Sequence, residues 1–135
     1  MKSLRSLLRD RQGLGAVEFA LIAPVIFAFI IAISQVGMLF YANAGLTNAL
    51  ADGARYAIIF PRPTNEQITA RITDRRFGLD PAFITGPTYT TPVTSNGITH
   101  MDITLSYAAP MDFIFFRASP VTLSETRRVY LQPQT

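Results

Sequence analysis

The stretch "RQGLGAVEFALIAPVIFAFIIAI", Arg11–Ile33, decides the N-terminal half of the fold. After Arg11 it contains one charged residue, Glu18, which follows Gly13 by five positions. A carboxylate near the centre of a lipid bilayer costs about 3 kcal/mol. Either Glu18 lies at a shallow depth in the membrane, where a charge is tolerated, or its position has a functional role.

The apolar run is long enough to cross a membrane. From Phe19 to Ala42 it counts 24 residues, interrupted only by the polar Ser34 and Gln35. About 20 residues of helix span the hydrocarbon layer. The sequence therefore predicts a transmembrane helix over residues 14–42.

Charge predicts the orientation of this helix. Residues 1–13 have a formal net charge of +3, whereas the remainder of the chain from Ala42 onward is close to neutral, with eight arginines and seven acidic residues. A basic flank places the N-terminus in the cytoplasm. We expect residues 1–13 to be a cytoplasmic leader and residues 43–135 a periplasmic domain, which includes the outer half of the long helix.

Two alternatives for the N-terminus remain open. A secretory signal peptide has a shorter apolar core and then a small-residue cleavage site, whereas "ANAGL" at 42–46 continues the helical pattern. An uncleaved anchor, carrying a periplasmic scaffold that binds an envelope partner, fits the length but gives Glu18 no role.

A processed precursor explains Glu18 better. "RDRQG" followed by "LGAVEF" resembles the cleavage site of type IV pilin precursors, in which a prepilin peptidase cuts after the glycine. The resemblance implies a cut between Gly13 and Leu14. The new amine of Leu14 would then pair with Glu18 of a neighbouring subunit, because buried charges are tolerated in pairs and such pairs can set register.

A wider resemblance covers residues 11–60. "GLGAVEFALIAPV" with "FYANAGLTNALADGARYA" is similar to the TadE-like family, the minor pilins (pseudopilins) of the tight-adherence (Tad/Flp) type IV pilus. It implies an inner-membrane protein that can enter the extracellular pilus, with a prepilin peptidase, the major pilin, other minor pilins and an inner-membrane assembly platform as partners. It also implies that Glu18 and Phe19 serve peptidase recognition and subunit register. The matching positions are Gly13, Glu18, Phe19, Pro24, Ala51, Gly53, Ala54, Arg55 and Ala57.

The helix is expected to continue beyond the membrane. Pro24 predicts a kink within the span. Apolar residues then recur three or four apart, as one helical face requires, until Pro61 and Pro63 end the helix near Ile59. Small residues on this segment would let a sheet or another helix approach closely; they are Ala42, Ala44, Gly45, Ala49, Ala51, Gly53 and Ala54.

A second, shorter helix is predicted in "RPTNEQITARITDRRFGLDP". Thr64 or Asn65 would cap it, Ile68 and Ile72 would form its apolar stripe, and Gly78 would stop it. Its arginines at 71, 75 and 76 are interpreted as a solvated face, with an anionic partner as the alternative.

Beyond Pro81 the pattern is that of strands. "TSNGITHMDITLSY" contains Asn96-Gly97, a strong hairpin signal, and Val121–Gln132 predicts a third strand. The fold class is therefore α+β: a long transmembrane helix, a short second helix and a three-stranded antiparallel sheet, as in type IV pilins. One strand face is expected to meet the long helix through Met101, Ile103, Leu105 and Tyr107.

An apolar loop is expected between Pro110 and Pro120. Phe113, Phe115 and Phe116 in it would either tuck under the sheet or form an exposed contact for another subunit.

The residue types argue against catalysis. The chain has no cysteine and a single histidine, His100, so neither a thiolate site nor a histidine metal set can form. We expect no enzyme activity, cofactor, metal or small-molecule substrate. Nucleic acid is also not expected, because the excess basic residues lie in the N-terminal tail and not on one face of a domain. Membrane lipid is the expected non-protein partner.

Overall fold

The computed structural model describes residues 14–113 and 116–132, and it divides the chain into two compact units, residues 1–36 and 37–135. The first unit, where described, is the N-terminal part of helix α2, Leu14–Ala57. The second holds the rest of α2, helix α3 (Asn65–Arg75), the short 3-10 helix η2 (Pro81–Phe83) and four strands.

Helix α2 ends where the sequence predicts. It runs for 44 residues without interruption at Pro24 and stops at Ala57, two residues before the predicted end. Pro61 follows four residues later and Pro63 two residues after that, and neither can donate a helical hydrogen bond. The prediction of one long helix is confirmed.

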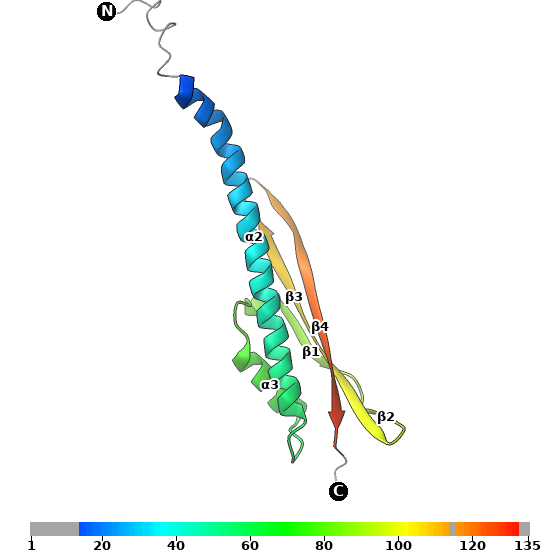
Figure 1. Cartoon of the computed structure of the whole chain (residues 1–135). Helices are drawn as coiled ribbons and strands as arrows, with labels where there is room; N and C mark the ends of the chain where they lie inside the picture. Colours follow the sequence, from blue (N-terminus) through cyan, green and yellow to red (C-terminus); the bar gives the residue numbers. More distant parts are fainter. Residues whose placement is uncertain (1–13, 114–115, 133–135) are drawn as a thin grey trace, which may run out of the picture. The chain divides into compact units, whose positions relative to one another are not determined.

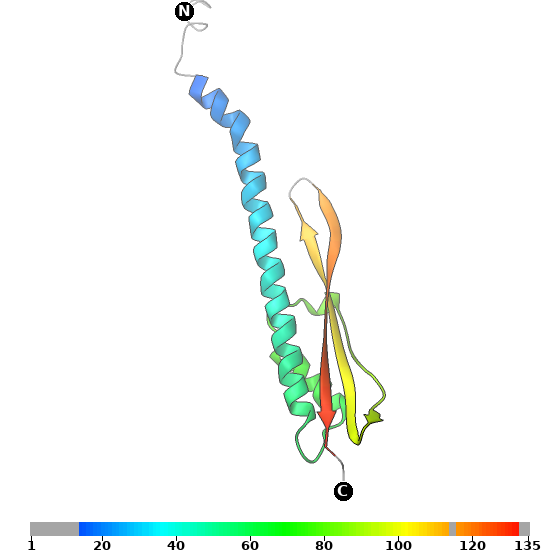
Figure 2. The ribbon, with the colours of Figure 1, turned by 45° about the vertical axis from the view of Figure 1, so that its right-hand side comes forward.

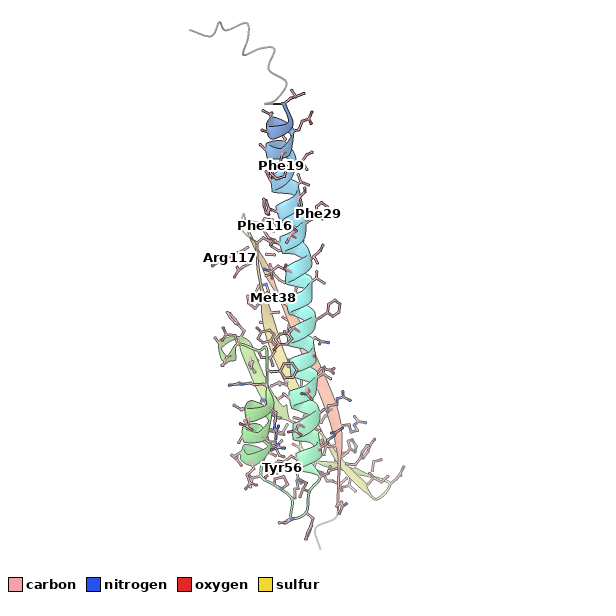
Figure 3. The ribbon with its side chains drawn as sticks, turned by 60° about the vertical axis from the view of Figure 1, so that its left-hand side comes forward. Phe19, Phe29, Met38, Tyr56, Phe116 and Arg117 are labelled. Atoms are coloured by element: carbon pink, nitrogen blue, oxygen red, sulfur yellow. The ribbon has the colours of Figure 1, made fainter. Side chains whose placement is uncertain are left out.

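Apart from Glu18, Ser34 and Gln35, the part of α2 in the first unit is apolar on all sides. Leu14–Val36 is free of buried residues, and aromatic side chains such as Phe19 and Phe29 project away from the ribbon (Figure 3). The helix is long and apolar enough to cross a membrane. Side chains that are apolar all round the axis favour a lipid surrounding.

Helix α3 forms as predicted at its start. Thr64 is the N-cap. Its Oγ1 accepts a hydrogen bond from the backbone N–H of Gln67 at 3.3 Å, and the backbone N–H of Thr64 donates to Gln67 Oε1 at 2.9 Å. Ile68 and Ile72 are buried, which confirms the predicted stripe. The helix ends at Arg75, before Gly78, so Gly78 is not its stop; a positive φ of 65° there instead lets the chain pass Tyr41.

The sheet has four antiparallel strands, and the prediction of three is wrong. They are β1 (Ile84–Tyr89), β2 (Val93–Ser95), β3 (Ile98–Asp112) and β4 (Arg117–Leu131). β4 follows one edge of β3, while β1 and β2 share the other edge (Figure 1). Asn96 and Gly97 make the β2–β3 turn with positive φ, as predicted.

Proline and glycine residues inside the strands explain why the sequence predicts one strand too few and a loop between Pro110 and Pro120. β1 contains Gly86 and Pro87, and its register shifts across them. Pro110 and Pro120 lie inside β3 and β4, at a second register shift that begins after Ala109. Proline is tolerated at such bulges because they leave backbone groups outside the ladder. β3 and β4 are therefore one long hairpin.

The core of the second unit lies between one sheet face and α2. Met101, Ile103, Leu105 and Tyr107 are buried, which confirms the predicted inward face. β3 and β4 run alongside the part of α2 from Gly37 on, in both views (Figures 1 and 2). From the helices and their connections, the core includes Ala42, Leu46, Ala49, Leu50, Ala57, Ile68, Ile72 and Leu79.

Glycines on α2 allow this close packing. A Cβ added at Gly53 would overlap the Ile72 side chain of α3, and one at Gly45 would overlap the backbone carbonyl of Phe77. The predicted close approach is therefore real at these two positions, and α3 with its following segment is the element that approaches.

Candidate functional site

The predicted processing site lies at the start of α2. Leu14 is the first residue of the helix and is exposed, whereas Gly13 lies outside the described residues. Glu18 and Phe19 follow one turn later, and both are exposed; Figure 3 labels Phe19. An accessible carboxylate in the first turns of an apolar helix remains available to a partner.

The next turns of α2 present a shallow apolar depression. It is lined by Pro24, Val25, Ala28, Phe29 and Ala32. Alanines occur at Ala16, Ala20, Ala28 and Ala32, with Pro24 completing a spacing of four, and small residues four apart allow a second helix to approach closely in a membrane. This spacing is visible in the sequence alone.

A charged cluster joins α2 to α3 in the second unit. Arg71 Nε lies 2.8 Å from Asp52 Oδ2, and Arg75 Nε lies 3.6 Å from the same oxygen. Both arginine side chains remain partly exposed, at 38% and 54%, so the predicted solvated face also carries an ion pair to α2. The sequence does not single out Asp52, because the periodicity of one helix does not reveal which side chain of another helix will lie beside it.

The outward face of the β3–β4 hairpin is a polar ladder. Arg128 donates to both carboxylate oxygens of Asp102, from Nε at 2.8 Å and from Nη2 at 3.0 Å. Hydroxyl pairs continue the ladder at Thr104–Thr126 (2.9 Å) and Ser106–Ser124 (3.0 Å). The hydrogen bonds from Arg128 hold the pKa of Asp102 below its ordinary value.

The predicted apolar loop is the end of a hairpin. Phe113 and Phe116 exchange two backbone hydrogen bonds, of 2.9 and 3.2 Å, and their rings stack with centroids 4.8 Å apart. Phe113 is half-buried and Phe116 is exposed, so Phe116 does not tuck under the sheet. Phe115 lies outside the described residues. The Phe116 and Arg117 side chains mark this end of the hairpin in Figure 3.

The described residues offer no evident metal centre. Across residues 14–113 and 116–132, no three side chains of the types histidine, cysteine, aspartate or glutamate gather as metal ligands would. The features that stand out are exposed apolar and paired charged surfaces, which suit binding to other macromolecules or to lipid.

Comparison with known families confirms the resemblance inferred from the sequence. The family model described as TadE-like protein matches residues 13–55. The match begins at Gly13, includes Glu18, Phe19 and Pro24, and ends at Arg55. No curated protein and no solved structure matches the chain.

Proposed function

We propose that this chain, TadE-like over residues 13–55, is a minor pilin (pseudopilin) that takes part in assembling a tight-adherence pilus. The observation that carries the proposal is the extent of the family match. It covers the predicted cleavage glycine, the glutamate after it and the helix as far as Arg55 in one continuous segment.

In this proposal the protein is made as a precursor in the bacterial inner membrane. Residues 1–13 stay in the cytoplasm, residues 14–42 cross the bilayer once, and residues 43–135 form the periplasmic domain. A prepilin peptidase recognises Glu18 and Phe19 and cuts between Gly13 and Leu14. The exposed position of Glu18, one turn into the helix, supports this role.

Assembly then depends on binding and not on catalysis. Apolar packing alone distinguishes poorly between lipid and a neighbouring helix. An ion pair between the new Leu14 amine and Glu18 of the next subunit would add orientation and register. The partners are the major pilin, other minor pilins and the inner-membrane assembly platform, and subunits that join the filament leave the cell with it.

The intact mass of the protein purified from its native membrane tests the processing step. A chain that begins at Leu14 supports the proposal. A chain that begins at Met1, in cells whose prepilin peptidase is active, favours the uncleaved periplasmic scaffold instead.

A pair of glycine variants provides the matched control. Gly13→Leu should leave the precursor uncut, because a large side chain replaces the glycine at the scissile bond. Gly15→Leu should still be cut, because it leaves Gly13 at the predicted scissile bond; within the chain, a Cβ at Gly15 meets no neighbour within 4 Å. Cleavage of both variants would contradict the assigned cut.

A further inference from the structure

Arg55, in the last turn of α2, has an exposed side chain without a counter-charge. Among residues 14–113 and 116–132, its guanidinium forms no ion pair and no hydrogen bond. Arg71 and Arg75, by contrast, both approach the Asp52 carboxylate, with Nε atoms 2.8 and 3.6 Å from Oδ2. The Arg55 guanidinium therefore keeps its planar set of N–H donors available for an anion from outside the chain.

A polar groove lies beside Arg55, between α2 and α3. It is lined by Asn48, Ala51, Asp52, Arg55 and Arg75. The Asp52 carboxylate is already engaged by Arg71, and the more exposed Asp74 lies 3.9 Å from Arg75. Three arginines thus face two carboxylates, which leaves one positive charge in excess at this groove. Surplus positive charge with free N–H donors favours a carboxylate or phosphate as ligand.

A second, apolar groove also includes Arg55, and it lies between α2 and β4. Its lining consists of Ala54, Arg55, Ile58, Arg128, Val129 and Tyr130. Arg128 is held by Asp102 through two hydrogen bonds, so its charge is already balanced. Ile58 and Tyr130 are 48% and 60% exposed, and they offer an aliphatic and an aromatic surface to an incoming side chain. This groove therefore favours an apolar group.

The two grooves meet at Arg55, on the exposed side of the part of α2 that lies between α3 and β4 (Figures 1 and 3). A ligand that fills both must carry an anionic group and an apolar group close together. Inorganic phosphate supplies only the first. A lipid supplies both, but most of its acyl chain would extend past so short a groove and remain in water. A peptide with an acidic residue near an apolar one matches both grooves without that cost.

We propose that this double groove is a docking site for a short acidic segment of a partner protein. An aspartate or glutamate of the segment pairs with Arg55, and a neighbouring apolar side chain packs against Ile58 and Tyr130. Covering the Arg55 guanidinium is favourable only when a carboxylate accompanies it, so a partner segment without one is disfavoured. The site does not depend on the pilin role, because every residue in it belongs to the unit that begins at Gly37.

Peptide selection on the full chain tests this site. The chain is immobilised in micelles of an uncharged detergent, and a phage-displayed library of random peptides is selected against it. A parallel selection uses Arg55→Gln, which removes the charge and keeps a polar side chain. Arg117→Gln is the matched control, since it also removes one exposed arginine, but at the end of β4 opposite to Val129 and Tyr130.

We expect the natural chain to enrich peptides that carry an acidic residue near an apolar one. A peptide from this set, measured by fluorescence polarisation, should bind Arg55→Gln roughly tenfold more weakly, because a charged hydrogen-bonded pair is lost. Arg117→Gln should bind it as the natural chain does, and Ile58→Ala should bind it several-fold more weakly through lost apolar contact. Circular dichroism checks that each variant is folded; all three substituted side chains are exposed.

Several outcomes would overturn the docking site. The site is refuted if no peptide is enriched, if the enriched peptides lack acidic residues, or if they bind Arg55→Gln as well as the natural chain. An unchanged affinity for Ile58→Ala would refute the apolar groove and, with it, a peptide as the ligand. Displacement of the peptide by an equal concentration of inorganic phosphate, or by phosphatidylglycerol in the micelles, would replace the peptide with a free anion or a lipid headgroup.

Discussion

Gly45 of α2 lies directly against the backbone carbonyl oxygen of Phe77, in the segment that follows α3. No residue with a Cβ fits there without moving one of the two backbones. The helix accepts a residue of low helical propensity at this position because the close approach of the α3 segment requires it.

Gly45→Ala should destabilise the folded unit that begins at Gly37 by about 2 kcal/mol, since the added methyl must displace backbone and not a flexible side chain. Gly37→Ala on the same helix is the control: a Cβ there meets no neighbour within 4 Å, and alanine favours helix. Denaturant unfolding of the full chain in detergent, followed by circular dichroism, measures both. Equal stability of the two variants would contradict the close packing at Gly45.

Burial on β3 gives a second prediction, with two isoleucines for comparison. Ile103 is 0% exposed in the core and Ile98 is 55% exposed on the same strand. Ile103→Ala should cost about 2–5 kcal/mol of unfolding free energy because it leaves a cavity. Ile98→Ala should change it by about 0.5 kcal/mol or less. If both substitutions cost the same in urea unfolding, the assignment of the inward sheet face is wrong.

The Asp102–Arg128 pair predicts a pH dependence. Its hydrogen bonds lower the pKa of Asp102 in the folded state, so the pair stabilises the fold above the ordinary aspartate pKa. That contribution is lost as the pH falls through the lowered pKa. Asp102→Asn should therefore be less stable than the natural chain at neutral pH, and the difference should shrink in acid.

Thermal unfolding between neutral and acidic pH measures this difference. Ser106→Ala is the control, because it removes an uncharged hydrogen bond from the same face, and its effect should not vary with pH in this way. A gap between Asp102→Asn and the natural chain that stays constant into acid would argue against the pair as its cause.

Local sequence signals predicted the parts of this fold that local chemistry determines. The end of α2 follows from Pro61 and Pro63, and the β2–β3 turn from Asn96-Gly97. The alternation on β3 likewise predicted which side chains are buried.

Features that depend on distant partners were not predictable in the same way. β1 contains Gly86 and Pro87, which weaken a strand signal, and it forms because β3 supplies a long edge. The sequence presents Pro110 and Pro120 as boundaries of a loop, yet both lie inside strands, at the register shift between Ala109 and Met111. The Asp52–Arg71 pair forms only when α2 and α3 pack together, and the periodicity of either helix alone does not predict that packing.

Glu18 gives the prediction closest to function. Glu18→Gln should leave membrane insertion intact, because it removes a charge from an apolar helix, yet it should abolish or strongly reduce piliation if the carboxylate pairs with a neighbour's N-terminal amine. Glu18→Asp keeps the charge and should retain part of the piliation. Membrane fractionation, the mass of the processed chain and a count of pili per cell separate insertion, cleavage and assembly. Normal piliation by Glu18→Gln would rule out the register role, whereas failure of cleavage alone would restrict Glu18 to recognition by the peptidase.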